Sequence, residues 1–153
     1  MKIAIQNLQE RFPLDLRGIR RLARQILAEL EVPEAELSIV FVGDAQIQQL
    51  NRRYLNRDKP TNVLAFPMQE GPFSGLHPQL LGDLVISVDT AKRQSNRFGL
   101  DDKGMITLLM IHGILHLVGY EHEGPSKRAR EMALKQKELL RLTLPQGQGQ
   151  KRR

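Results

Sequence analysis

Two histidines inside an apolar run constrain this chain more than any other feature. The segment from Met105 to Val118 is apolar nearly all round, so we predict that it forms a helix buried in the core. His112 and His116 are four residues apart in this segment and would project from one face of that helix. Left unpaired, each buried imidazole would cost about 1 to 3 kcal/mol. A metal ion shared by the two imidazoles removes that cost, whereas a lone histidine there would more often be a hydrogen-bonded core residue.

A third histidine follows the end of this predicted helix. Gly119 is expected to end the helix, because glycine accepts the left-handed conformation that turns the chain back. His122, three residues later, can then return toward the first two histidines. Three neutral imidazoles with a fourth position open to water are the arrangement of a catalytic zinc site. We therefore predict that His112, His116 and His122 bind a metal ion.

The length and composition indicate one domain without a membrane segment. At 153 residues the chain suits a single domain with a substantial core, placed at 1–145, followed by a disordered basic tail at 146–153. There is no cysteine, so disulfides and thiolate ligands are excluded, and a metal must use nitrogen and oxygen donors. The N-terminus lacks the apolar core of a signal peptide, and the longest apolar run is too short to span a bilayer.

The hydrophobic pattern predicts an α/β or α+β domain, with about five helices packed on a small mixed sheet of about four strands. The strands are expected at 2–6, 37–42, 63–66 and 82–88, and the helices at 15–31, 44–54, 89–98, 105–118 and 126–142. Three aspartates are predicted helix N-caps: Asp44, Asp89 and Asp101. On the helix at 44–54, three residues are expected on the buried side: Ile47, Leu50 and Tyr54. The helix at 105–118 is the central packing element, and His77 is expected in a surface loop without a ligand role.

The excess of basic residues predicts a polyanionic partner. The formal net charge is +6 and the sequence pI is about 10.0. Four arginines form a stripe on the helix at 15–31: Arg17, Arg20, Arg21 and Arg24. A second basic cluster follows the helix at 44–54: Arg52, Arg53, Arg57 and Lys59. The first stripe is a candidate phosphate-contacting face, although an ordinary solvated helix surface explains it about equally well.

The histidine spacing is that of the metzincin metalloproteases, with one decisive difference. Their motif places a general-base glutamate directly after the first histidine. This chain has Gly113 at that position. A peptidase without this carboxylate would lack the group that deprotonates the metal-bound water. We therefore expect a related metal scaffold with a different chemistry.

The segment from His112 to His122 resembles the signature of the YbeY-like endoribonucleases. Further blocks similar to that family occur in the same order at 50–54, 58–67, 82–83 and 90–94. The resemblance implies a cytoplasmic, single-strand-specific, metal-dependent endoribonuclease that acts in 16S rRNA 3′-end maturation and ribosome quality control. It also implies one Zn²⁺ per chain, held by His112, His116 and His122. The implied partners are rRNA and the small ribosomal subunit, with neither DNA nor a membrane expected.

Two departures from the family pattern bear on catalysis. The family usually has an arginine directly after the aromatic residue of the 50–54 block, where this chain has Leu55. Arg57 is the candidate replacement for that guanidinium. The family also usually has aspartate before the last histidine, where this chain has Glu121. Glu121 and Asp83 are candidate general bases, but Glu121 can instead orient a histidine and Asp83 can instead cap a loop or strand end.

Two other functions are compatible with the same residues. The first is a metal-dependent hydrolase of another substrate class. The basic clusters count against it, because they favour RNA as the substrate. The second is a ribosome assembly factor in which zinc only stabilises the fold. A structural zinc site needs four protein ligands, so this second reading requires Glu121 or Glu123 to complete the shell.

Overall fold

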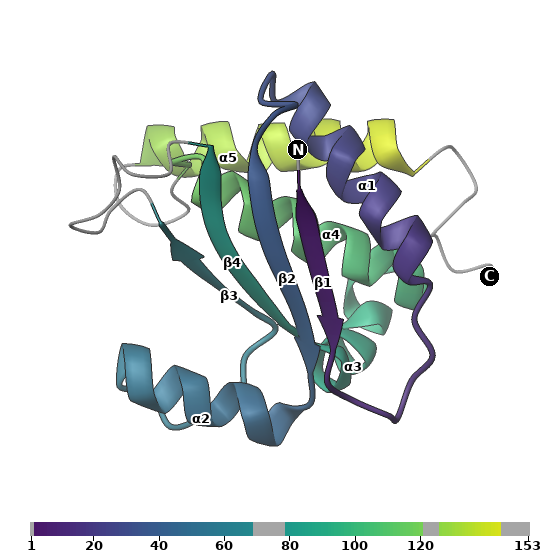
Figure 1. Cartoon of the computed structure of the whole chain (residues 1–153), viewed down its shortest axis with the longest axis vertical. Coiled ribbons are helices and arrows are strands. Elements are labelled where there is room, and N and C mark those ends of the chain that lie inside the picture. Colours follow the sequence, from purple (N-terminus) through teal and green to yellow (C-terminus); the bar gives the residue numbers. More distant parts are fainter. Residues whose placement is uncertain (1, 69–78, 121–125, 145–153) are drawn as a thin grey trace.

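The chain forms one mixed sheet covered mainly on one face by helices (Figure 1). The computed structural model describes residues 2–68, 79–120 and 126–144, and all structural statements below refer to these residues. The elements follow in the order β1 (Ile3–Asn7), α1 (Leu16–Glu29), β2 (Glu36–Val42), α2 (Asp44–Leu55), β3 (Val63–Pro67), β4 (Leu80–Ser87), α3 (Val88–Phe98), α4 (Asp102–Leu117) and α5 (Ser126–Thr143). The predicted fold class, with four strands and five helices in the described ranges, is confirmed.

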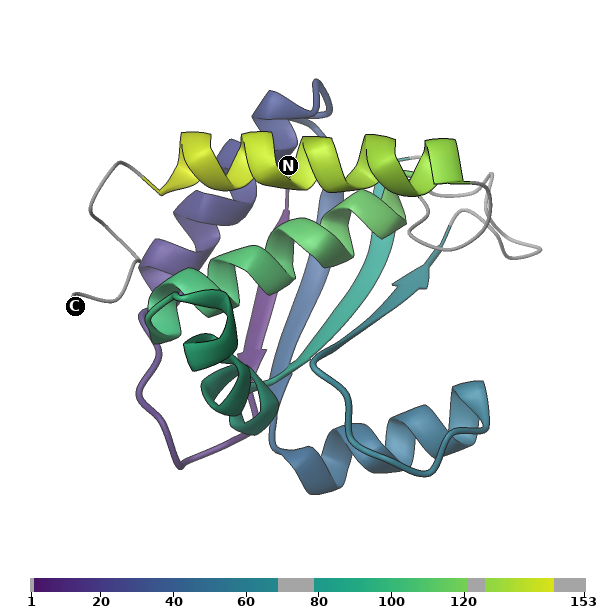
Figure 2. The same ribbon diagram turned by 180° about the vertical axis from the view of Figure 1, so that it is seen from behind.

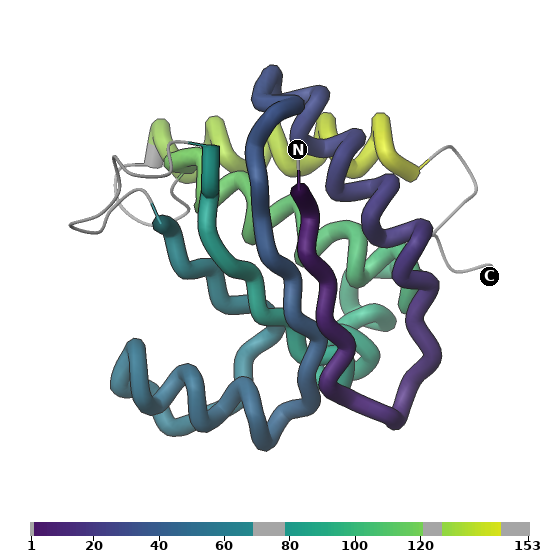
Figure 3. The backbone as a smooth tube through the Cα atoms, viewed as in Figure 1, coloured from purple at the N-terminus to yellow at the C-terminus, as the bar shows by residue number. Residues whose placement is uncertain are grey.

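The strand order in the sheet is β1-β2-β4-β3, and Figure 3 shows the four strands side by side. β1, β2 and β4 are parallel, whereas β3 runs antiparallel to β4. Among the described residues β3 pairs with β4 alone, so it forms one edge of the sheet and β1 forms the other. The β3 edge borders the candidate site described below.

The apolar helix α4 is the centre of the packing, as predicted. It runs along one face of the sheet and contacts β3 and β4, with α5 packed on its outer side (Figure 2). Every residue of α4 from Gly104 to Ile111 is buried. Because strand side chains alternate between faces, Ile39 of β2 and Leu84 of β4 belong to the core beneath this helix.

The opposite face of the sheet is covered by α2 near the C-terminal ends of β2 and β4. A smaller apolar cluster forms there from Val42, Ile47, Leu64 and Val85. In Figure 1, α2 lies below the sheet and points away from β1. The chain then runs back along α2, where the Asn51 side chain donates a hydrogen bond to the carbonyl of Lys59, and reaches the start of β3.

Three predicted details of α2 and α3 are wrong. The N-cap of α2 is Gly43 rather than Asp44, and the N-cap of α3 is Ser87 rather than Asp89. Both aspartates lie in the first turn of their helices, where the helix dipole stabilises a carboxylate. Their oxygens accept hydrogen bonds from other elements. Tyr54 is 57% exposed instead of buried, because α2 lies at the end of the sheet and faces it with Ile47 and Leu50.

Other predicted boundaries hold closely. Asp101 is the N-cap of α4, and its Oδ1 accepts a hydrogen bond of 2.8 Å from the backbone N–H of Gly104. β4 begins at Leu80, two residues before its predicted start. The predicted loop position of His77 and the tail at 146–153 lie outside the described residues. Within the part of the chain that is described, no helix is both long and apolar enough to cross a membrane.

Candidate active site

The side chains of His112 and His116 are in contact near the C-terminal end of α4, as their spacing predicts. Their Nε2 atoms are 3.2 Å apart, and the ring centroids are separated by 4.8 Å at an interplanar angle of 76°. Both residues are half-buried, while Gly113, Ile114 and Leu115 between them are buried. The two imidazoles therefore lie at the boundary between the core and the solvent.

Gln136 of α5 holds the first of these imidazoles. Its Oε1 lies 2.8 Å from His112 Nδ1. An amide oxygen only accepts hydrogen bonds, so Nδ1 carries the proton and donates it. The neutral ring then has its lone pair on Nε2, which points toward His116. A hydrogen bond of this kind fixes the tautomer and ring orientation of a metal-binding histidine.

The geometry of this histidine pair fits a shared metal ion. Two nitrogens at about 2.0 to 2.1 Å from a tetrahedral zinc ion would be about 3.3 Å apart, close to the 3.2 Å separation of the two Nε2 atoms. In the described ranges, no group of three or more histidine, aspartate or glutamate side chains converges on one point. His122, the predicted third ligand, lies outside these ranges, as does Glu121.

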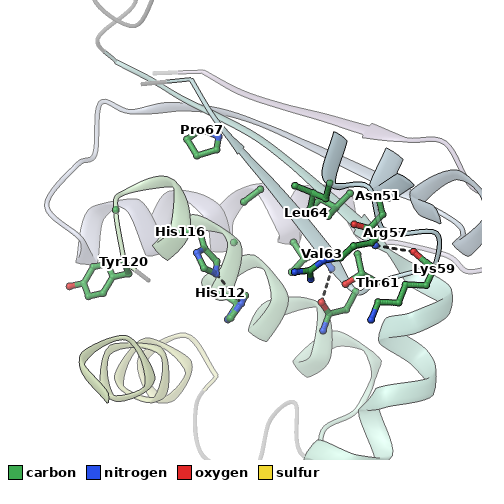
Figure 4. Close-up of a pocket in the computed structure, with 15 residues that line it drawn as sticks. Asn51, Arg57, Lys59, Thr61, Val63, Leu64, Pro67, His112, His116 and Tyr120 are labelled. Atoms are coloured by element: carbon green, nitrogen blue, oxygen red, sulfur yellow. Dashed lines mark hydrogen bonds between the residues drawn. The ribbon is translucent and has the colours of Figure 1, made fainter. Parts of the chain in front are cut away.

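A cleft of about 700 Å³ opens in front of the histidines (Figure 4). It runs along the edge strand β3, with α4 on one side and the segment from α2 to β3 on the other. The polar residues among those that line it are Asn51, Arg57, Lys59, Thr61, Asn62, His112, His116 and Tyr120. The cleft thus combines a potential metal site with two cationic side chains on the facing wall.

The wall that carries Arg57 is held by two asparagines. The Asn51 side chain donates a hydrogen bond of 2.9 Å to the carbonyl of Lys59, and the Asn51 backbone carbonyl accepts one of 3.3 Å from the N–H of Arg57. The Asn62 side chain donates a hydrogen bond of 3.0 Å to Gln94 of α3 and accepts one of 2.7 Å from the backbone N–H of Val63. These contacts fix the loop, while the Arg57 side chain is exposed in the cleft.

Leu55, which stands at the family arginine position, lines the same cleft as Arg57. The structure therefore places the predicted replacement beside the position that it would replace. Asp83 does not line this cleft. It lies in β4 next to Leu84, and because alternate strand residues face opposite sides, it points away from the α4 face.

Gly113 occupies the position of the protease glutamate for a packing reason. A Cβ atom at this glycine would lie 2.6 Å from Leu84 Cδ2 and 3.3 Å from Val63 Cγ2. α4 therefore approaches β3 and β4 too closely at this point for a side chain without rearrangement of the core. The absence of a glutamate here follows from the close contact between helix and sheet.

Asp44 connects the first turn of α2 to α3. Its Oδ1 accepts hydrogen bonds from Ser87 Oγ at 2.7 Å and Thr90 Oγ1 at 2.6 Å, and its Oδ2 pairs with Arg93 at 2.5 Å. Burial alone raises the pKa of Asp44, but these three hydrogen bonds and the charge of Arg93 outweigh it. The net effect holds the pKa of Asp44 below its ordinary value of 3.8.

The predicted arginine stripe lies away from the cleft. α1 packs beside β1, at the opposite edge of the sheet from β3 (Figure 1). Arg17, Arg21 and Arg24 are exposed on this helix, whereas Arg20 is half-buried and its Nε donates to the carbonyl of Ile3 at 3.4 Å. The two predicted basic surfaces are therefore separate.

Comparison with known sequences decides the family. The family model described as Endoribonuclease YbeY matches residues 4–143. The chain belongs to the YbeY endoribonuclease family. The Endoribonuclease YbeY of Geobacter metallireducens is 43% identical over 148 residues, covering 96% of this chain and 99% of that protein. The Endoribonuclease YbeY of Syntrophotalea carbinolica is 47% identical over 138 residues, covering 90% and 92% respectively.

The fold is also that of a solved protein. The solution structure of TM1509 from Thermotoga maritima superposes with a TM-score of 0.63 at 24% identity, covering 92% of this chain and 88% of that one. The predicted YbeY resemblance and the endoribonuclease class are thus confirmed by the family match. Gln136 was not predicted from the sequence, and Asn51 was recognised only as part of the 50–54 block, without its structural role. For Asn51 a signal existed, because it lies four residues after the buried Ile47 on the same helix face.

Proposed function

We propose that this YbeY family member is a zinc-dependent endoribonuclease that cleaves single-stranded rRNA. The process that we assign to it is 16S rRNA 3′-end maturation, with a role in ribosome quality control, in the cytoplasm. The observation that carries the proposal is the pair of imidazoles 3.2 Å apart facing Arg57 across the cleft. This arrangement supplies a metal site and a cation to the same phosphodiester. The family to which the chain belongs supports RNA as the substrate.

In this proposal His112, His116 and His122 hold one Zn²⁺ within a catalytic domain at 1–145. Zinc bound in such a site polarises a phosphoryl oxygen or lowers the pKa of bound water toward about 7. His112 would offer Nε2, because Gln136 accepts the proton-bearing Nδ1. The basic tail at 146–153 would add positive charge for RNA.

Arg57 would bind the scissile phosphate from the opposite wall. Its guanidinium can donate two parallel hydrogen bonds to phosphate oxygens. Charge that develops on these oxygens during cleavage is then stabilised by a donor that is already in place. The backbone of Arg57 is held by Asn51, which preserves the position of the donor.

Glu121 is our candidate for the proton-transferring group. It precedes His122 in the sequence, so its carboxylate is near the third proposed ligand along the chain. It would accept a proton from the attacking water and return one to the leaving oxygen. The rRNA and the small ribosomal subunit would be the partners, and the net charge of +6 favours their approach.

Metal removal tests the zinc requirement. The full chain would be stripped with a chelator, restored with Zn²⁺, and assayed on a single-stranded RNA and on the same RNA annealed to its complement. We expect internal cleavage of the single strand by the restored protein only. Equal cleavage before and after stripping, or equal cleavage of the duplex, would contradict the proposal.

A further inference from the structure

We propose that Tyr54, together with Arg53 and Phe66, forms a stacking surface for one unpaired base of the RNA strand that leaves the cleft. This inference rests on the proposed RNA-cleaving function. It adds a binding site outside the histidine cleft and assigns its ligand class as a single-stranded nucleobase with its phosphate.

Tyr54 is exposed although helix periodicity predicts that it is buried. Its exposed fraction is 57%, while Ile47 on the same helix is fully buried. Aromatic rings are scarce in this chain, which has two tyrosines, five phenylalanines and no tryptophan. A large ring left in solvent on a helix that could have buried it offers a flat apolar face to a ligand.

The ring is held in place by the edge strand. Tyr54 and Phe66 form an edge-to-face pair with centroids 5.4 Å apart and an interplanar angle of 68°. Phe66 belongs to β3 and packs against the apolar cluster beneath α2. Because Phe66 restrains the tyrosine ring before RNA arrives, stacking a base on it costs little side-chain entropy.

A positive charge accompanies the ring. The guanidinium carbon of Arg53 lies over the Tyr54 ring, 5.5 Å from its centroid, and the Arg53 side chain is exposed, so a base would stack on the ring face that Arg53 does not cover. A ring with an adjacent arginine is suited to a nucleotide, since the ring takes the base and the guanidinium takes the phosphate. An apolar peptide would gain nothing from this charge.

The surface lies directly around the edge of the sheet from the cleft. Leu55, the residue after Tyr54, lines the cleft, as do Ala65 and Pro67 on either side of Phe66. Alternation along β3 puts Phe66 on the opposite face from Ala65 and Pro67. An RNA strand that crosses β3 at this point therefore passes from the metal site to Tyr54. Only an unpaired base can stack there, so the surface favours single strands over duplexes.

The test uses the zinc-loaded full chain and an oligoadenylate of about ten nucleotides with phosphorothioate linkages that resist cleavage. Since the chain has no tryptophan, Tyr54→Trp introduces a single tryptophan whose emission can be excited selectively, and we expect RNA to quench this emission. Tyr54→Ala should weaken binding by about 5- to 100-fold, whereas Tyr54→Phe should bind within about two-fold of wild type. Phe98→Ala, which removes another exposed ring on α3, should leave the affinity unchanged.

Two results would overturn the inference while leaving the nuclease function intact. One is equal RNA affinity of Tyr54→Ala and wild type, and the other is RNA binding by Tyr54→Trp without a change in emission. If wild type neither binds nor cleaves single-stranded RNA, the proposed function fails and this inference fails with it. Circular dichroism and thermal unfolding of each variant establish that the fold is retained. The second of these results, together with quenching by an acidic peptide of matched charge, would point to a protein partner instead.

Discussion

At the scale of single residues, the proposed mechanism takes its phosphate-binding cation from Arg57, two residues after Leu55. Both line the cleft opposite His112 and His116, so a guanidinium from either position can reach the same space. We expect Arg57→Ala to lower the rate of RNA cleavage by about 100-fold or more, because a fixed donor to the developing charge is lost. Single-turnover cleavage of a single-stranded RNA measures this rate.

The double variant Leu55→Arg/Arg57→Ala is the matched control for this prediction. It moves the guanidinium to the position that the family usually uses, and we expect it to recover part of the lost rate. Full activity of Arg57→Ala with an unchanged unfolding curve would remove Arg57 from the mechanism.

In the proposed metal site, Gln136 would act as a positioning residue. Its Oε1 accepts from His112 Nδ1 at 2.8 Å, and loss of such a partner typically lowers metal affinity by about 10- to 100-fold. We expect this loss for Gln136→Leu, while Gln136→Glu, which keeps an acceptor, should retain most of the affinity. Competition with a chromogenic zinc chelator measures the affinity directly. Lys137→Leu changes the next, exposed residue of α5 and should have no effect; equal affinity of Gln136→Leu and wild type would refute the role.

At the scale of secondary-structure elements, one carboxylate joins α2 to α3. Asp44 of α2 bonds to Ser87, Thr90 and Arg93, and these bonds hold its pKa below the ordinary value. A carboxylate with a lowered folded-state pKa stabilises the fold above its unfolded-state pKa, and this stabilisation is lost as the pH falls through the folded-state value.

We therefore expect wild type to be more stable than Asp44→Asn at about pH 7 and the difference to narrow toward about pH 3. Urea unfolding at several pH values between these limits measures the two free energies of unfolding. Asp58→Asn, a change on the exposed loop after α2, should stay within about 0.5 kcal/mol of wild type. A difference between wild type and Asp44→Asn that does not vary with pH would contradict this account.

Much of the fold could be predicted from the sequence because local patterns decide it. The continuous apolar run of α4 requires burial on all sides, and its i, i+4 histidines share a face in any α-helix. Strands and helices alternate clearly enough to predict the mixed sheet. The cleft residue Arg57 was also predicted, although from resemblance to a family rather than from its local surroundings.

The parts that could not be predicted depend on contacts between distant segments. Asp44 and Asp89 have the residue type of N-caps, but their side chains bind other segments. Asp44 accepts a hydrogen bond from Ser87, and Asp89 forms an ion pair of 3.1 Å with Arg11. Gln136 contacts His112 across 24 residues, which depends on how α5 lies against α4. The exposure of Tyr54 depends on where α2 meets the end of the sheet. The hydrophobic periodicity of α2 does not predict that position.

At the scale of the whole molecule, two of the basic groups lie at opposite edges of the sheet. Arg57 and Lys59 line the cleft and Arg52 lies in the last turn of α2, whereas the α1 stripe lies beside β1. Figure 1 shows the two regions on opposite sides of the molecule. A short RNA bound in the cleft should therefore contact the first group and not the α1 stripe.

We expect Arg52→Gln/Arg57→Gln/Lys59→Gln to weaken binding of a ten-nucleotide RNA and to flatten its dependence on salt, because fewer counterions are released. The matched variant Arg17→Gln/Arg21→Gln/Arg24→Gln removes the same charge and should leave this binding within about two-fold of wild type. Fluorescence anisotropy over a salt series measures both. Equal weakening by the two variants would contradict a binding path confined to the cleft edge.

The central claim is that the histidine site cleaves rRNA through a bound metal. The most direct measurement is cleavage of ribosome-associated 16S precursor RNA by zinc-loaded wild type beside His116→Ala purified identically, with zinc content determined for both. The account predicts precursor cleavage and bound zinc for wild type, and neither for His116→Ala. Equal cleavage by both proteins, or zinc bound by wild type without any cleavage, would contradict it.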